Sequence, residues 1–156
     1  MTDVVDVAPY CSDDRAAVLA LASRLCVGVA RWRPTDGVRS VVHAWVSESI
    51  DALGERQAVF VARADGQVVG FVAVCEQEHW SGQVDAYVGE LVTADSWEGR
   101  GVGRALLGRA EGWARDQGLD RVSLETGAAN TRARAFYERQ GYQDEEVRLT
   151  RILAPT

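Results

Sequence analysis

Three glycines at alternate positions, Gly99, Gly101 and Gly103, lie in the run Ser96-Trp-Glu-Gly-Arg-Gly-Val-Gly-Arg104. Such glycines let the backbone turn so that successive N–H groups point at one spot. The amphipathic run behind them predicts a helix, whose first turn adds unpaired N–H donors and partial positive charge. Arg100 and Arg104 add charge on either side. The pattern favours a phosphate or pyrophosphate site, and the alternative is a strand-to-helix turn that binds no ligand.

The residues around these glycines disfavour two other phosphate-binding loops. A P-loop requires Gly-Lys-Ser/Thr, whereas this chain has Gly103-Arg104-Ala105. A dinucleotide fingerprint requires a third glycine three residues after the second, where this chain has Leu106, or Arg104 if counted from Gly99. A nucleotide-binding module of the Rossmann type is therefore a distant alternative.

A second group of residues follows the next predicted strand, in the order Asn130, Ala133, Phe136, Tyr137, Gly141 and Tyr142. Asn130 suits the N-cap of a helix over 131–140. Taken with the glycine loop, this spacing resembles the GNAT superfamily of acyl-CoA-dependent N-acetyltransferases. The resemblance covers residues 55–153 well, and the first fifty residues only as strand, helix, helix.

The resemblance implies an α/β fold in which helices flank a mixed, mostly antiparallel central sheet. A splayed strand pair in that sheet would form the acyl-CoA cleft, and residues 1–156 would be a single N-acetyltransferase domain. Acetyl-CoA would be the co-substrate, its pantetheine arm adding beside one strand as an extra strand does. The cofactor-binding residues implied in this way are Leu91, Val92, Thr93, Gly99, Arg100, Gly101, Val102, Gly103, Arg104 and Asn130.

The resemblance also implies catalytic roles. Tyr137 would donate a proton to the departing CoA thiolate, since a phenol of pKa about 10 lies close to a thiol of about 8.5. Glu90, in an otherwise apolar strand, is the candidate general base, with Glu125 and Glu76 as weaker alternatives. Purely structural roles remain open for both residues: Tyr137 as a core aromatic, and Glu90 as a strand carboxylate that is ion-paired or faces solvent. The amine would attack the thioester directly, with no covalent enzyme intermediate.

The acceptor is expected on the side of the first two helices. Aromatic side chains with carboxylates could hold a cationic amine, so a small-molecule amine is favoured slightly over a protein lysine or N-terminus. A non-catalytic acyl-CoA sensor or interaction module is the alternative function, supported by Glu98, because a carboxylate beside pyrophosphate is unfavourable unless it points away or pairs with Arg100 or Arg104. A homodimer is implied by the resemblance alone. The residues expected near the acceptor are Trp32, Arg33, Asp36, His43, Trp45, Glu78, His79 and Trp80.

The elements that must position these groups follow from periodicity and turn signals. A helix is predicted from an N-cap at Ser12 to about Gly28, and Asp65-Gly66 predicts a hairpin turn. The hairpin's second strand has almost no polar face, so both of its faces should be covered. The other helices are predicted over 38–53, 102–117 and 131–140, and the strands over 2–8, 57–63, 67–76, 85–93, 121–126 and 146–153.

The amino-acid composition disfavours several classes of protein and of partner. The chain has 156 residues, 47% of them hydrophobic, and a net charge of −6, which disfavours nucleic acid as a partner. The three cysteines and two histidines lack metal-ligand spacing, so we expect no metal site, no disulfide framework and a reducing, cytoplasmic location. No apolar run is long enough to predict a membrane span, and the N-terminus does not resemble a signal peptide. The net negative charge of the chain suits a cationic acceptor.

Overall fold

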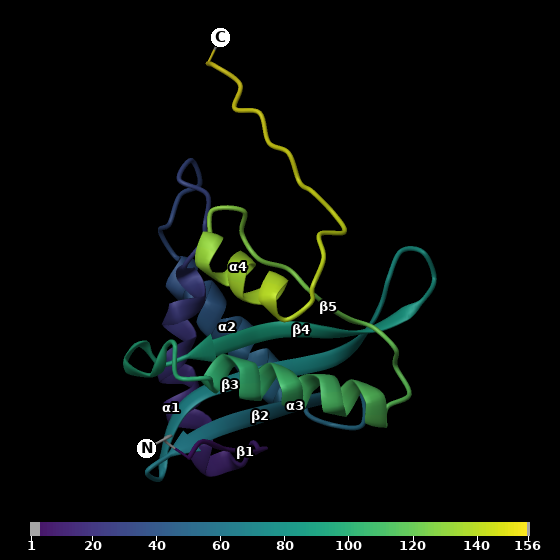
Figure 1. Ribbon diagram of the computed structural model, residues 1–156. Coiled ribbons are helices and arrows are strands. Elements are labelled where there is room, and N and C mark those ends of the chain that lie inside the picture. Colours follow the sequence, from purple (N-terminus) through teal and green to yellow (C-terminus); the bar gives the residue numbers. More distant parts are fainter. Residues whose placement is uncertain (1–3, 156) are drawn as a thin grey trace.

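The computed structural model describes residues 4–155, which form one mixed sheet with helices on both faces (Figure 1). The strands lie in the order β1-β2-β3-β4-β5. Consecutive strands from β1 to β4 pair antiparallel, whereas β5 pairs parallel to β4. The predicted mixed, mostly antiparallel sheet is therefore confirmed. The strands are β1 (Asp6–Pro9), β2 (Gln57–Ala64), β3 (Gln67–Glu78), β4 (Val84–Thr93) and β5 (Val122–Leu124).

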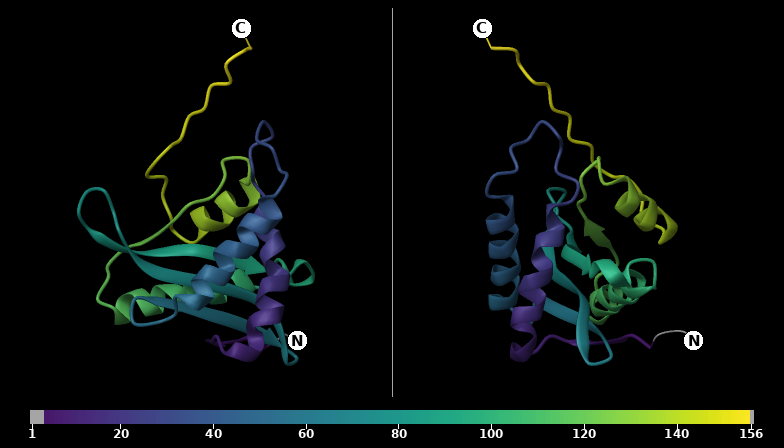
Figure 2. Two further views of the ribbon diagram at one scale, coloured as in Figure 1. Left: turned by 180° about the vertical axis from the view of Figure 1, so that it is seen from behind. Right: turned by 90° about the vertical axis from the view of Figure 1, so that its left-hand side faces the viewer.

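Helices α1 (Arg15–Leu21) and α2 (Val38–Asp51) cover one face of the sheet, and α3 (Val102–Asp116) and α4 (Thr131–Arg139) lie on the other (Figure 2). On the α3 face, Leu106 packs in one buried cluster with Val72 and Val88. On the other face, Phe71 belongs to a second cluster with side chains of α1 and α2. Because neighbouring residues of β3 enter different clusters, the prediction that both faces of this strand are covered is confirmed.

The first predicted helix is divided into three pieces. A 3-10 helix (Ser12–Asp14) precedes α1, and a second one (Ala22–Cys26) follows it. The N-cap is Cys11 rather than Ser12, because the Asp14 carboxylate accepts a hydrogen bond from the Cys11 N–H at 2.9 Å. The tighter second 3-10 turn ends before Gly28, whose φ of +91° is outside the helical region.

The two ends of the chain depart most from the predicted strands. In the first predicted strand, over 2–8, residues 2 and 3 lie outside the described residues, and β1 runs on to include Pro9. The prediction of a last strand over 146–153 is wrong: residues 143–155 have no regular structure and extend away from the sheet (Figure 1). The strand predicted over 121–126 is shortened to β5. A strand needs a neighbouring strand to pair its backbone groups, and among residues 4–155 none pairs with residues 125–126 or with residues 146–153. No helix within residues 4–155 is long and apolar enough to cross a membrane.

Candidate active site

The strands β4 and β5 pair over only three positions, from Ala86 opposite Val122 to Val88 opposite Leu124. Beyond Val88, no strand of the described chain pairs with this edge of β4. On this side, the backbone from Gly89 to Thr93 therefore has no strand partner, as expected for a splayed pair of strands. An open edge of this kind can take an extended ligand as a further strand.

A β-bulge at Gly89 decides the direction of Glu90. In the register with β3, Ala73 faces Glu90 and Val74 faces Val88, so Gly89 is an extra residue in β4. Side chains alternate along a strand, and one inserted residue reverses every side chain beyond it. If side chains alternated regularly through Gly89, Glu90 would lie on the same buried α3 face as Val88. With the bulge, Glu90 lies on the α2 face.

Glu90 is buried there, with 6% of its surface exposed, and it meets α2. The hydroxyl of Ser49 is within hydrogen-bond distance of both carboxylate oxygens. Burial raises the pKa of Glu90 to about 7, and the hydrogen bond from Ser49 partly offsets this rise. A carboxyl with this pKa is partly ionised at neutral pH and can accept a proton there.

A cavity of about 600 Å³ lies between α2 and the sheet, and Glu90 is part of its wall. Trp45 and Tyr87 supply aromatic surface, and Glu48 and Glu125 supply further carboxylates. This combination suits a cation. In residues 4–155, no group of three His, Cys, Asp or Glu side chains is placed to hold a metal ion.

The lining of this cavity agrees only in part with the residues that the sequence predicts near the acceptor. Of the residues expected near the acceptor, Trp45 lines it, and the other seven, all within residues 4–155, do not. Glu48, Ser49 and Tyr87 were missed. The first two follow Trp45 by three and four residues, so helical spacing alone places them on the same side of α2.

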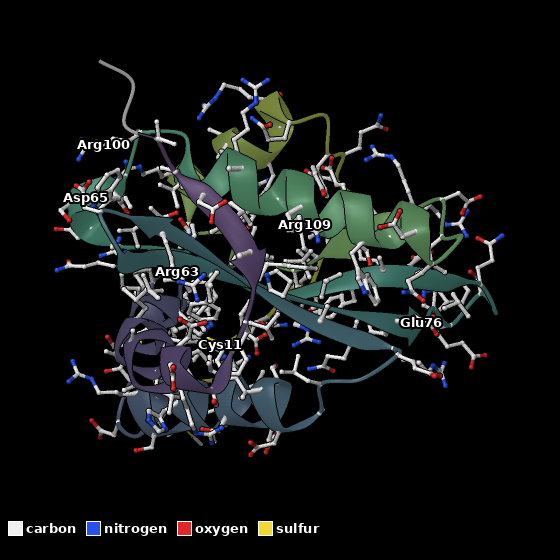
Figure 3. All side chains as sticks on the ribbon, turned by 90° about the horizontal axis from the view of Figure 1, so that it is seen from below. Cys11, Arg63, Asp65, Glu76, Arg100 and Arg109 are labelled. Carbon is white, nitrogen blue, oxygen red and sulfur yellow. The ribbon has the colours of Figure 1, made fainter. Side chains whose placement is uncertain are left out.

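The two alternative bases differ in their surroundings. Glu125 lines the same cavity as Glu90. Glu76 forms an ion pair with Arg56, whose Nε lies 2.8 Å from its carboxylate. It also lies at the opposite end of the sheet from Arg100 of the glycine loop (Figure 3). Glu76 is therefore poorly placed for chemistry at the open part of β4.

The glycine loop leads directly into α3. Gly99 and Gly101 have φ values of +73° and +84°, which side chains other than glycine rarely adopt. The first helical hydrogen bond runs from the Ala105 N–H to the Gly101 carbonyl at 3.0 Å, so the N–H groups of residues 102–104 have no acceptor in the helix. No described side chain caps this end of α3. It is therefore suited to binding an anion.

The loop lies close to the open edge of β4. A Cβ on Gly103 would lie 3.6 Å from Oγ1 of Thr93 and 3.5 Å from the Phe136 ring, so the start of α3 is in contact with the end of β4 and with α4. Arg100 stacks on the Trp97 ring, 4.0 Å from its centroid. The predicted anion-binding loop and the strand edge are thus neighbours in the fold.

Glu98 pairs with two arginines from distant segments. Its carboxylate binds Arg24, which precedes α2, and Arg132 on α4. The sequence left open whether Glu98 points away from the loop or pairs with Arg100 or Arg104, and the structure adds Arg24 and Arg132 as its partners. Arg24 and Arg132 lie 74 and 34 residues from Glu98 in the chain, so only the fold brings them next to the loop.

Helix α4 carries the remaining predicted residues. The Oδ1 of Asn130 accepts a hydrogen bond from the Ala133 N–H at 3.2 Å, which confirms it as the N-cap. Tyr137 lies between Phe136 and Tyr142, with ring centroids 5.2 and 5.8 Å away. Burial raises the pKa of Tyr137 to about 12, so its phenol stays protonated at neutral pH and can donate a proton.

Glu90 and Tyr137 lie on opposite faces of the sheet. Glu90 faces α2, whereas Tyr137 packs against the buried cluster that contains the α3 side chains. Figure 2 shows α1 and α2 on one side of the sheet and α3 and α4 on the other. A group held between β4 and β5 would therefore have the proposed base on one side and the proposed acid on the other.

Residues 19–142 match the Acetyltransferase (GNAT) family. An uncharacterized N-acetyltransferase of Methanocaldococcus jannaschii is 33% identical over 97 residues, which cover 60% of this chain and 42% of that protein. An aminoglycoside N(6')-acetyltransferase type 1 of Stenotrophomonas maltophilia is 34% identical over 94 residues, 57% of this chain and 61% of that protein. The match thus spans about half the length of these curated relatives.

The fold is also found in solved structures. An aminoglycoside N-acetyltransferase in complex with CoA superposes with a TM-score of 0.75, covering 99% of this chain and 98% of that one. The two sequences are 18% identical, so this likeness concerns the fold alone.

Proposed function

The chain belongs to the acetyltransferase (GNAT) family, and on this basis we propose that it transfers an acetyl group from acetyl-CoA to a primary amine. In this proposal, residues 1–156 act as a single N-acetyltransferase domain. The observation that carries the proposal is a buried carboxyl of pKa about 7 beside an open strand edge that ends next to an uncapped helix N-terminus.

The co-substrate acetyl-CoA would bind along this edge. Its pyrophosphate would accept hydrogen bonds from the N–H groups between Arg100 and Arg104, and its pantetheine arm would pair with the backbone of Leu91 and Thr93. Asn130 would contact the pantetheine. Two observations support this path. On its β5 side, β4 has no strand partner in the described chain beyond Val88, and Thr93 at its end lies beside the start of α3. The CoA complex of the aminoglycoside N-acetyltransferase with the same fold supports it as well.

The proposed reaction removes two protons from the acceptor nitrogen and adds one to the leaving sulfur. Glu90, directly or through water, takes a proton from the acceptor ammonium, and the free amine then attacks the thioester carbonyl. Backbone N–H groups near Leu91 and Val92 stabilise the charge that develops on the carbonyl oxygen. The C–S bond breaks and Tyr137 donates a proton to the leaving CoA thiolate. The acetyl group stays on the amine, whose nitrogen releases its second proton to water as the amide forms, and Tyr137 takes a proton back from water.

We propose a small cationic amine as the acceptor. Glu48, Glu90 and Glu125 line one cavity with Trp45 and Tyr87, so a second positive group of the acceptor can stay paired while its reacting amine loses a proton. The name of the Stenotrophomonas relative, an aminoglycoside acetyltransferase, agrees with a polycationic small molecule.

Release of free CoA thiol from acetyl-CoA across a panel of amines tests the proposal. We expect di- and polyamines to support faster release than neutral or anionic amines, and Glu90→Gln to reduce it. Tight CoA binding with no release for any amine would instead indicate a non-catalytic acyl-CoA-binding module. A thermal shift with CoA but not with NAD would separate both from a nucleotide-binding module.

A further inference from the structure

At the end of α2, one backbone carbonyl is bound by a side chain from the sheet. The last carbonyls of a helix lack the N–H groups that would bind them inside the helix. At Ser49, the N–H four residues on belongs to Leu53, and it binds the Ile50 carbonyl instead, at 3.4 Å. The Gln57 Nε2 donates a hydrogen bond to the Ser49 carbonyl at 2.7 Å. Gln57 therefore caps the end of this helix from eight residues further along the chain.

Gln57 itself is held in place by the sheet. It is the first residue of β2 and lies opposite Cys75 of β3. Its own carbonyl accepts a hydrogen bond at 3.1 Å from the N–H of Gly54, in the turn that joins α2 to β2. A side chain on a strand is positioned more precisely than one on a loop. The cap thus ties the end of α2 to a fixed point on the sheet.

The capped residue is also the one that contacts Glu90. The Ser49 carbonyl binds Gln57, while the Ser49 hydroxyl lies within hydrogen-bond distance of both carboxylate oxygens of Glu90. All three residues line the same cavity. Strand β3 lies between Gln57 and Glu90, and Ser49 is hydrogen-bonded to both. The contacts therefore form one line from β2 through α2 to β4.

We propose that Gln57 is a positioning residue for the proposed base: by capping Ser49, it holds the end of α2 where the Ser49 hydroxyl reaches Glu90. The inference rests on the proposed function for the role of Glu90 as a base. Helix ends fray where their carbonyls are not capped. Without the cap, the hydroxyl would spend less time on the carboxylate and would stabilise its ionised form less.

Other titratable groups also line this cavity. They come from α2, β3, β4 and the segment after β5, and they are Glu48, Cys75, Tyr87 and Glu125. Burial raises the pKa of Cys75 and that of Tyr87, so both side chains are neutral near pH 7. In residues 4–155 the Gln57 side chain is hydrogen-bonded to none of these four side chains. Replacing Gln57 by another neutral residue therefore changes none of the charges around Glu90.

A titration of Glu90 that needs no substrate tests the proposal. The NMR chemical shift of its side-chain carboxyl carbon reports its protonation in the isotope-labelled full chain, and Glu90→Gln identifies the signal. Gln57→Met keeps a side chain of similar length and removes the donor. We expect the midpoint of the titration to rise by up to about one pH unit, the size expected for the loss of one hydrogen bond to the ionised form.

Two comparisons separate this role from a general loosening of α2. Arg15→Met removes another side-chain link at the same end of the helix, the ion pair of Arg15 with Asp51 at 2.9 Å, and should leave the midpoint in place. In Ser49→Ala, which lacks the hydroxyl, Gln57→Met should add no further rise. An unchanged midpoint in Gln57→Met, an equal rise in Arg15→Met, or a rise that persists in Ser49→Ala would each overturn the proposal.

The titration also keeps this inference apart from the proposed function. Circular dichroism verifies that each variant is folded, and Gln57→Leu is the second variant without the donor. A chain that shows the expected midpoints but transfers no acetyl group would contradict the proposed function and leave the contact from Gln57 to Glu90 supported. In an active chain, the low-pH limb of kcat should move with the midpoint. A limb that stays in place while the midpoint moves would exclude Glu90 as the base and overturn the positioning role.

Discussion

The Ser49 hydroxyl on α2 lies 2.9 and 3.0 Å from the two carboxylate oxygens of Glu90 on β4. These residues are 41 positions apart in the chain, and the bulge at Gly89 brings them together. Two opposing effects therefore act on one carboxyl. Burial favours its neutral form, and the hydroxyl favours its ionised form by donating a hydrogen bond, with burial the larger effect.

The pH dependence of the reaction tests Glu90 as the base. Because burial raises the pKa of Glu90 to about 7, the carboxyl is protonated and inactive well below pH 7, and its activity should rise through pH 7 to a plateau. Glu90→Gln should lower kcat roughly 10²- to 10⁴-fold and remove this limb of the profile. A Gln variant that keeps both its rate and its low-pH limb would exclude Glu90, and Glu125→Gln would be the next variant to measure.

The same pKa predicts a gain in stability in Glu90→Gln. The unfolded chain ionises Glu90 near pH 4.5, whereas the folded chain holds the proton to about pH 7. The wild type therefore loses stability as the pH rises from 4.5 to 7, and Gln does not. At pH 8 we expect Gln to be more stable by roughly 1–3 kcal/mol, since each pKa unit corresponds to about 1.4 kcal/mol. Urea unfolding at pH 4.5 and pH 8 measures this difference.

Removing the Ser49 hydroxyl should raise the pKa of Glu90 further, because the hydrogen bond that stabilises its ionised form is lost. Ser49→Ala should shift the low-pH limb of the rate profile above pH 7 and reach nearly the same plateau. Ser47→Ala is the matched control on the same helix and should leave the limb in place. An unshifted limb in Ser49→Ala would mean that the limb belongs to another group.

The sequence predicted the elements whose signals are local. Asp65-Gly66 forms the predicted turn, and Asn130 caps α4 as its side chain allows. The bulge at Gly89 could not be predicted, since the alternation of β4 alone does not reveal an extra residue. A bulge is recognised only in the register with a neighbouring strand. The direction of Glu90, and with it the cavity, depends on that register.

Contacts between residues far apart in the chain could not be predicted from the sequence either. Glu98 was compared only with the arginines nearest to it in the chain, whereas its partners Arg24 and Arg132 come from two other elements. The predicted strand over 146–153 failed for a related reason. Strand propensity describes a segment's preference, but a strand forms only where an edge pairs its backbone.

Tyr137→Phe tests the proposed general acid. The variant keeps the ring that packs between Phe136 and Tyr142 and loses only the hydroxyl, so kcat should fall roughly 10²-fold while the affinity for CoA is kept. Because the pKa of Tyr137 is raised to about 12, no high-pH limb from this phenol should appear below pH 10. Stopped-flow thiol release at several pH values measures both quantities.

Tyr142→Phe is the control for that variant. The Tyr142 hydroxyl donates a hydrogen bond to Glu111 of α3 at 3.1 Å, so its loss should lower the free energy of unfolding by about 1 kcal/mol. Its kcat should stay near that of the wild type. An equal loss of kcat in both variants would indicate that the aromatic packing of α4, and not the acidity of one hydroxyl, supports the rate.

Glu98→Gln tests how the carboxylate beside the glycine loop affects CoA binding. Glu98 pairs with Arg24 and Arg132, so removing its charge makes the surroundings of the proposed pyrophosphate site more positive by one unit. One unit charge acts on another with about 1 kcal/mol at 4 Å in water, so we expect the Kd for CoA to fall about fivefold and to depend more steeply on salt.

Asp95→Asn is the matched control for Glu98→Gln. Asp95 also pairs with Arg24, at 3.3 Å, but its side chain is 88% exposed, so water screens its charge and the Kd should change little. Isothermal titration at low and high salt measures both variants, and thermal unfolding shows whether each stays folded. Weaker CoA binding in a folded Glu98→Gln would contradict the electrostatic argument. It would mean that Glu98 aids CoA binding by fixing the positions of the two arginines.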